Sequence, residues 1–434
     1  MKRRIVMLFV LLFIFEGRAL SKAHEGQFTL KNAIEYACEH NSDIQRSKEK
    51  IEQLDHSFKN AISTAFPTVD LNSAYKYYTS AATSTSSGTR DPLESYDFSL
   101  NLTQPVYSGG KIVATISRAH LNRESAKLDL ELSTQNVTFE VMKSYFSTVL
   151  LNEKLYTLQR SAELERKLLK LVENKFKVGI ATQYDVLKIK VLLNNIEPQI
   201  LDMEAQIKDA QFKLNSLLGR DAKALFVVVD KLDIYPLRAD SFEAGFKMAE
   251  LHRVELQKIQ KQEEILKQDK KIEMAPYWPT LTGTAKYGYT HKDFSHIVDD
   301  TSNEWSVGGT LKIPLFAGLG SFSKASEFTS KQVILNMDKA SLHDDIISEL
   351  KTALVDLEKT KNKLQVAGQA VKDAQEAFRL AQRLYKAGRL TTLDLVTSER
   401  DSLDSQFYFL QTKYDYYLAS VNIRKVEGLD VFVK

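Results

Sequence analysis

The hydrophobic positions along the chain change their period several times, and each change marks the boundary of a predicted element. From Phe28 to about Ser63, apolar residues recur at helical spacing among charged residues, which predicts one amphipathic helix. Pro67 ends this helix, because proline disfavours helical geometry in the residue before it. Apolar and polar residues then alternate over 69–77 and 96–102, which predicts two strands with one apolar face each.

A long segment without glycine or proline follows, from Lys111 to Val178. Its apolar residues share a seven-residue register, which predicts a coiled-coil helix; they include Leu121, Leu128, Met142, Val149 and Tyr156. At about 1.5 Å per residue, such a helix is roughly 100 Å long. A second helix runs back from a break at Gly179 to about Leu218, and we expect Pro198 to interrupt and kink it.

The second half of the chain repeats this order of elements, which predicts an internal duplication. Trp278-Pro279-Thr280 matches Phe66-Pro67-Thr68, and a second long helix with apolar residues at sevens breaks at Gly388. The first structural repeat, residues 24–240, contains the first helix, a β-hairpin at 68–106, a long helical hairpin at 111–218 and a side segment at 219–240 with a short strand. The second repeat, residues 241–434, contains a helix, a β-hairpin at 280–315 and a long helical hairpin at 321–426.

Both helical hairpins turn at the same motif, Phe176-Lys-Val-Gly-Ile-Ala-Thr-Gln-Tyr-Asp-Val186 and Tyr385-Lys-Ala-Gly-Arg-Leu-Thr-Thr-Leu-Asp-Leu395. Gly179 and Gly388 supply the left-handed residue that commonly ends a helix. Thr182 and Thr391 are placed to cap the next helix, with Asp185 and Asp394 at its third position. Helix capping is therefore the minimum role of these residues.

Composition and charge narrow the possible location of the protein. Residues 1–23 combine Lys2-Arg3-Arg4, a short apolar run and small residues at cleavage spacing, which predicts a signal peptide. The formal net charge of +3 is too small to indicate a basic surface that would bind nucleic acid.

The one-sided strands are typical of membrane barrels, but an open four-stranded sheet leaves unpaired edges in lipid. We therefore expect the barrel to be shared between protomers, with a polar inner face that includes Asp70, Asn72, Asp97, Asn101 and Lys312.

This duplicated organisation resembles the TolC-like outer-membrane efflux protein family over nearly all of the mature chain. The best-matching motifs are Tyr385 to Asp394, Gln104-Pro-Val-Tyr-Ser-Gly-Gly110 and the Pro-Thr pairs at 67 and 279. The resemblance implies an α+β fold in which three protomers build a twelve-stranded barrel in outer-membrane lipid, continued by a periplasmic helical coiled-coil barrel. It also implies a passive exit duct joined to an inner-membrane pump through a periplasmic adaptor.

The resemblance also implies roles for the repeated turns. An aspartate matching Asp394 lines the closed periplasmic entrance in family members, and residues matching Asp185 and Tyr385 help to hold neighbouring coils shut. Gly179, Thr182, Gly388 and Thr391 then lie at the coiled-coil tips, where an adaptor would dock. The chain departs from the family pattern at Leu390, in place of a basic residue, and at Thr397, in place of a second aspartate. We therefore expect a single acidic ring and fewer polar ties at the entrance.

Other chemistry has little support in the sequence. His291 and His296 share a loop with three aspartates, but they lack metal-ligand spacing, and no serine, histidine and acid arrangement suggests hydrolysis. We predict no enzyme activity, no cofactor and no metal. Two alternatives remain open: a duct for type I protein secretion, and a soluble periplasmic coiled-coil adaptor or structural protein. The sequence does not identify the cargo.

Overall fold

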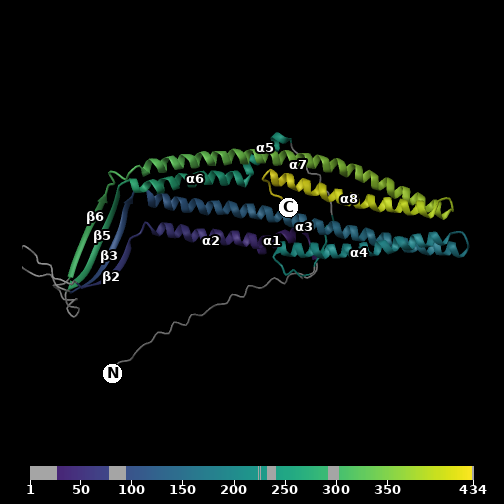
Figure 1. The fold of residues 1–434 in the computed structure, drawn as a ribbon, viewed down its shortest axis with the longest axis horizontal. Helices are drawn as coiled ribbons and strands as arrows, with labels where there is room; N and C mark the ends of the chain where they lie inside the picture. Colours follow the sequence, from purple (N-terminus) through teal and green to yellow (C-terminus); the bar gives the residue numbers. More distant parts are fainter. Residues whose placement is uncertain are drawn as a thin grey trace, which may run out of the picture.

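The computed structural model describes residues 27–77, 94–222, 224, 226–231, 241–291 and 303–432. The molecule is elongated, with a β-sheet at one end and long helices that run from it to the opposite end (Figure 1). The predicted signal peptide at 1–23 lies outside the described residues. Within the described ranges, no helix combines the length and the apolar character needed to cross a bilayer.

Two similar series of elements make up the chain, as the repeated pattern predicts. The first consists of β1 (Gln27–Phe28), α1 (Leu30–His40), α2 (Ser42–Ser63), β2 (Thr68–Tyr77), β3 (Glu94–Ser108), α3 (Lys111–Lys177), α4 (Gln183–Leu218) and β4 (Val227–Val228). The second consists of α5 (Phe242–His252), α6 (Val254–Met274), a 3-10 turn (Ala275–Tyr277), β5 (Thr280–His291), β6 (Asn303–Lys312), α7 (Gly320–Lys386) and α8 (Thr392–Val426). The central helices α3 and α7 have 67 residues each, which corresponds to roughly 100 Å.

The prediction of one helix over 28–63 is wrong, because the chain breaks at Asn41 between α1 and α2. The Asn41 side-chain oxygen accepts hydrogen bonds from the backbone N–H groups of Asp43 and Ile44, and so caps α2. Its amide nitrogen donates to the carbonyl oxygen of Leu217, in the last turn of α4, at 2.7 Å. This break therefore ties the first helices to the end of the returning helix.

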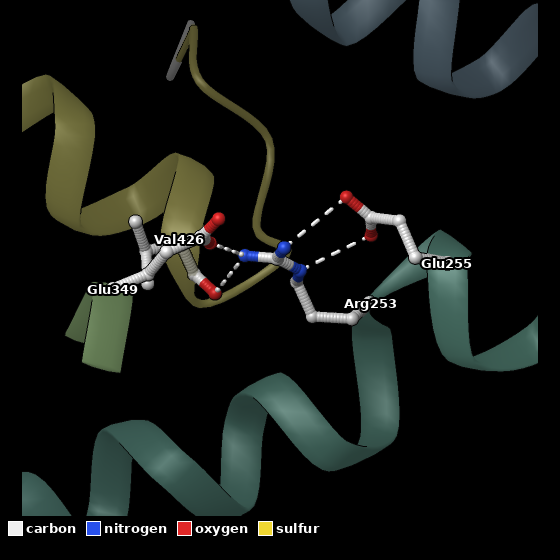
Figure 2. A network of polar contacts seen from close by, with 4 residues as sticks. All are labelled: Arg253, Glu255, Glu349 and Val426. Carbon is white, nitrogen blue, oxygen red and sulfur yellow. Dashed lines mark hydrogen bonds and ion pairs between the residues drawn. The ribbon is translucent and has the colours of Figure 1, made fainter. Parts of the chain in front are cut away.

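Arg253 occupies the equivalent break between α5 and α6, and Figure 2 shows its contacts. One nitrogen, Nη1, donates to Glu349 Oε2 at 2.8 Å and to the carbonyl oxygen of Val426 at 3.2 Å. The other two nitrogens donate to the carboxylate of Glu255. The second repeat thus makes the same connection to the last turn of its returning helix, with a guanidinium in place of an amide.

The expected interruption at Pro198 is also wrong, because α4 continues through this residue as one helix. Proline removes one backbone hydrogen bond and crowds the preceding turn, which favours a break. However, Ile189 and Ile196 are buried on the same helix. The burial of this apolar face offsets the cost of the proline, because tertiary packing supplies most of the stability of a helix in a protein.

The four long strands form an antiparallel sheet in the order β2-β3-β5-β6. Its register aligns apolar side chains in rows across the strands; one such row is Leu71, Leu100, Tyr287 and Trp305. Leu71 and Trp305 are 72% and 75% exposed, so this apolar face is open in the single chain. The next row, Asp70, Asn101, Lys286 and Ser306, points to the opposite face. Among the described residues, the outer edges of β2 and β6 have no strand partner.

Candidate functional site

The repeated turns lie at the two hairpin tips, at the end of the molecule farthest from the sheet (Figure 1). Gly179 and Gly388 have φ angles of 76° and 74°, in the left-handed region, as the sequence predicts. The residue after each glycine donates its N–H to a carbonyl five positions earlier, Ile180 to Lys175 and Arg389 to Leu384. Both helices therefore end with the same glycine-based cap.

Threonine caps the next helix in both turns. Thr182 and Asp185 form a complete reciprocal box: the Thr182 hydroxyl accepts from the backbone of Asp185 at 3.2 Å, and the Asp185 carboxylate accepts from the backbone of Thr182 at 2.9 Å. Thr391 likewise accepts from the backbone N–H of Asp394 at 3.2 Å and donates its hydroxyl to that carboxylate at 2.6 Å. Each cap contributes about 1 kcal/mol to the stability of its helix.

The two aspartates differ in their surroundings. Asp394 is exposed, whereas Asp185 is half-buried. Hydrogen bonds from the Thr182 hydroxyl and then from the Thr182 backbone lower the pKa of Asp185, and Thr392 of the other hairpin adds a weaker contribution. Asp185 thus interacts across the two hairpins, while Asp394 presents its charge to solvent.

Tyr385 lies at the centre of the contact between the tips. It is 4% exposed and packs in an apolar cluster with Val172, Val186, Ile189, Ala381, Leu395 and Val396. The Thr392 hydroxyl donates to the Tyr385 hydroxyl at 3.3 Å. From the other hairpin, Lys175 Nζ donates to the carbonyl oxygen of Tyr385 at 3.0 Å and lies 4.0 Å from the centre of its ring. We call Lys175, Asp185, Tyr385 and Thr392 the tip latch.

Of these four residues, the family resemblance singles out Asp185 and Tyr385, whereas nothing in the sequence singles out Lys175 or Thr392; their functional roles stay predictions. A basic residue in the last turn of a helix is common, so Lys175 carried no specific signal. Thr392 stands beside the capping Thr391 and was read as part of that turn. The two departures noted in the sequence have other roles here: Leu390 packs against the apolar cluster, and the Thr397 hydroxyl donates to the Leu393 carbonyl of its own helix.

The described residues contain no group of three or more His, Cys, Asp or Glu side chains arranged to hold a metal ion. His291 is the last residue of β5. The other members of the weak histidine and aspartate constellation, at 293, 296, 299 and 300, lie outside the described residues.

A sheet with an exposed apolar face, continued by two very long helical hairpins with matching tips, is the arrangement of outer-membrane channel proteins. The chain belongs to the outer membrane efflux protein family, whose model matches residues 33–220 and 246–429. The two matched ranges correspond to the internal duplication. Members of this family are channel and transport proteins that lie in the outer membrane and extend into the periplasm. This chain therefore lies in the outer membrane and extends into the periplasm.

Individual relatives are distant but similar over most of their length. The chain is 19% identical to the outer membrane protein TolC of Vibrio cholerae over 332 residues, which is 76% of each chain. It is 22% identical to the pyoverdine export outer membrane protein OpmQ of Pseudomonas putida, and 20% identical to the alkaline protease secretion protein AprF of Pseudomonas aeruginosa. Each of these two matches covers 77% of this chain and 70% of the relative.

Solved structures share the fold. The outer membrane protein VceC of Vibrio cholerae is 16% identical with a TM-score of 0.76, and the match covers 93% of this chain and 97% of that one. The CmeC outer membrane channel of Campylobacter jejuni is 17% identical with a TM-score of 0.78, covering 93% and 87%. The open state of the MtrE outer membrane channel of Neisseria gonorrhoeae is 16% identical with a TM-score of 0.77, covering 93% and 89%.

Proposed function

We propose that three copies of this chain form one outer-membrane channel that serves as a passive exit duct. The observation that carries this proposal is the four-stranded sheet, with its exposed apolar face and its open edges at β2 and β6. Backbone groups at an open edge have no hydrogen-bond partner in lipid, so the sheet needs neighbours. Pairing of β6 with β2 of the next copy closes a barrel, and three copies give twelve strands.

The helical hairpins extend from this barrel as a periplasmic tunnel, and their tips meet a periplasmic adaptor that is joined to an inner-membrane pump. The turns at Gly179, Thr182, Gly388 and Thr391 present a docking surface. Tyr184, Leu187 and Leu393 beside these turns are 67%, 53% and 53% exposed, which suits apolar contact with a partner. In this proposal the pump supplies the energy, and the duct itself is passive.

The tip latch and Asp394 form the entrance of the duct in this proposal. Lys175 and Tyr385 join the two hairpins of one protomer, so the entrance opens when this contact separates. Asp394 lies on the exposed side of the same turn, where three copies would form a ring of negative charge that favours cations. Asp185, which is half-buried, would act mainly by holding the two hairpins together.

We propose small molecules, drugs included, as the cargo. The names of two relatives support this choice: OpmQ is a pyoverdine export protein, and ArpC of Pseudomonas putida, 22% identical to this chain, is an antibiotic efflux pump outer membrane protein. Protein secretion is the second candidate, since AprF is named for the secretion of alkaline protease. A soluble periplasmic adaptor fits less well, because it would expose Leu71 and Trp305 to water.

The test is to purify the full-length protein from the outer-membrane fraction and to measure its mass in detergent and its conductance in planar bilayers. We expect a mass of three protomers and discrete channel openings. A monomer in the soluble periplasmic fraction would overturn the proposal. Export of a small dye or of a reporter protein, measured with the cognate pump, separates the two cargo classes.

A further inference from the structure

Two glutamates are buried between the two helical hairpins, at a position that the entrance described above does not use. Glu165 of α3 and Glu399 of α8 are 5% and 6% exposed. The Ser161 hydroxyl donates to Glu399 Oε1 at 2.9 Å, and Ser161 precedes Glu165 by one turn on the same face of α3. We call the packing of α3 residues 143–175 against residues 385–414 of α7 and α8 the hairpin seam.

Neither carboxyl group has a cationic partner among the described residues. Glu399 has the Ser161 hydroxyl, and Glu165 Oε2 has no hydrogen-bond partner. A buried carboxylate without a partner is costly, so such a group becomes neutral by binding a proton. Burial raises the pKa of Glu165 to about 8, and the nearby charge of Glu399 adds to this rise. Burial also raises the pKa of Glu399 to about 7.

The charged groups around the pair are exposed and do not offset this burial. Arg160, Glu163 and Lys167 of α3 and Lys386 of α7 line the two cavities that Glu399 borders, and all four are exposed. On the α4 side, Glu197 pairs with Arg166 at 3.4 Å, and both side chains are about half exposed. Lys154, a half-buried cation of the seam, donates a hydrogen bond to Gln411 and lies eleven positions, or about 16 Å, from Glu165 along α3.

We propose that Glu165 and Glu399 form a proton-binding site in the hairpin seam, and that release of its protons loosens the packing of the two hairpins. Protons reach the pair from water in the cavities that border Glu399. When both groups are ionised, two like charges lie near each other in the buried seam, and separating the hairpins lets water solvate them. Protonation removes this repulsion and closes the seam.

The site is connected to the tip latch. A cavity of about 210 Å³ is lined by both Glu399 and Tyr385, and Leu395, one turn before Glu399, packs in the same cluster as Tyr385. Loosening of the seam at Glu399 therefore disturbs the packing of Tyr385, the side chain that Lys175 contacts. This consequence for opening rests on the proposed channel function, whereas proton binding itself does not.

A proton fits the site better than a metal ion. The described residues place two carboxyl groups and one hydroxyl here, with no third His, Cys, Asp or Glu ligand. A divalent cation usually takes more oxygen ligands than the pair supplies. A protonated carboxyl group is neutral, so it needs no further ligand to balance a charge.

The first experiment measures proton binding independently of channel activity. Infrared spectra of the full-length protein are recorded from pH 6 to pH 9, and the carbonyl band of protonated carboxyl groups is followed. We expect this band to decrease across the range in the wild type and to be absent in the double variant Glu165→Gln, Glu399→Gln. The control carries Glu163→Gln and Asp401→Asn, two exposed acids on the same helices, and should titrate as the wild type does. An identical titration in the glutamine variant would overturn the proposal.

The second experiment measures opening in planar bilayers over the same pH range. We expect the open fraction of the wild type to rise at least about tenfold between pH 6 and pH 9, since one pKa unit corresponds to a tenfold change in equilibrium. The glutamine pair should stay closed throughout, because it imitates the protonated state. A flat wild-type response, or a pH response that EDTA abolishes, would overturn the assignment to protons. If no channel forms at any pH, the proposed function fails, and the infrared titration still decides whether the site binds protons.

Discussion

Lys175 and Tyr385 connect the two helical hairpins near their tips, although they lie 210 positions apart in the chain. The lysine ammonium group contacts both the carbonyl oxygen and the aromatic face of Tyr385. The hydrogen bond restrains the last turn of α7, and the ring contact restrains the side chain that fills the apolar cluster. Lys175 therefore adds two polar contacts between α3 and α7 to the apolar packing of the tips at the proposed entrance.

Replacing Lys175 with methionine should increase the open fraction of the channel. A hydrogen bond to a charged donor and a cation–π contact together contribute about 1–2 kcal/mol, and their loss changes an equilibrium roughly five- to thirtyfold. Single-channel recording measures the open fraction. Lys177→Met, an exposed lysine of the same helical turn, is the control. Equal open fractions in the two variants would show that Lys175 is not a latch.

Asp394→Asn should reduce the preference of the channel for cations and weaken its block by multivalent cations, because it removes the exposed charge at the tip. The asparagine side chain can still accept a hydrogen bond from Thr391, so the loss of stability should stay below about 1 kcal/mol. Reversal potentials in a salt gradient give the selectivity. Asp401→Asn is the control, one exposed acid farther along α8. Unchanged selectivity and unchanged block in Asp394→Asn would exclude an entrance ring at this position.

Asp185→Asn should lower the thermal stability of the protein more at pH 6 than at pH 3. The hydrogen bonds from Thr182 lower the pKa of Asp185 from its ordinary value of 3.8. The ionised group therefore contributes stability above pH 3.8, and this contribution is lost as the pH falls through the lowered pKa. Melting temperatures of wild type and variant at both pH values measure the difference. A difference that does not change with pH would contradict this account.

Gly428→Ala should destabilise the fold much more than Gly388→Ala. Both glycines have left-handed φ angles, 72° and 74°, which cost an alanine about 1–2 kcal/mol. At Gly428 a new Cβ atom would also lie 2.7 Å from the carbonyl carbon of His252, whereas at Gly388 nothing lies within 4 Å. We expect a loss of about 3 kcal/mol or more at Gly428. Denaturant unfolding measures both values, and equal losses would rule out a tight approach between these helix ends.

Arg253→Met should lower the free energy of unfolding by about 2–4 kcal/mol, because it leaves the Val426 carbonyl and two carboxylates without their shared donor. Arg253→Lys should recover only part of this loss, since an ammonium group cannot reproduce the planar set of donors. Arg46→Met is the control in the first repeat, where a highly exposed guanidinium pairs with Asp43. Denaturant titration gives the values, and a loss as small as that of Arg46→Met would show that the network in Figure 2 does not stabilise the fold.

Local sequence was sufficient to predict the elements whose period is long and regular. The helix from Lys111, the turns at Gly179 and Gly388, and the alternating strands all appear where the pattern places them. The breaks at Asn41 and Arg253 were missed, because the apolar period continues across them. Their partners, Leu217 and Val426, are 176 and 173 positions away, so no local window contains both groups.

The sequence by itself determined the two hairpins and the capping of their tips, because each depends on residues within a few positions of one another. The duplication followed from the recurrence of these local patterns in the second half of the chain. Only the tertiary structure decided what the tips and the seam contain. Lys175 meets Tyr385, and Glu165 lies near Glu399, because α3 packs against the second hairpin in one particular register. Glutamates elsewhere on α3, such as Glu131, Glu140 and Glu163, are exposed. Burial and long-range partners, which a linear pattern does not encode, therefore separate a latch or a proton site from an ordinary charged helix face.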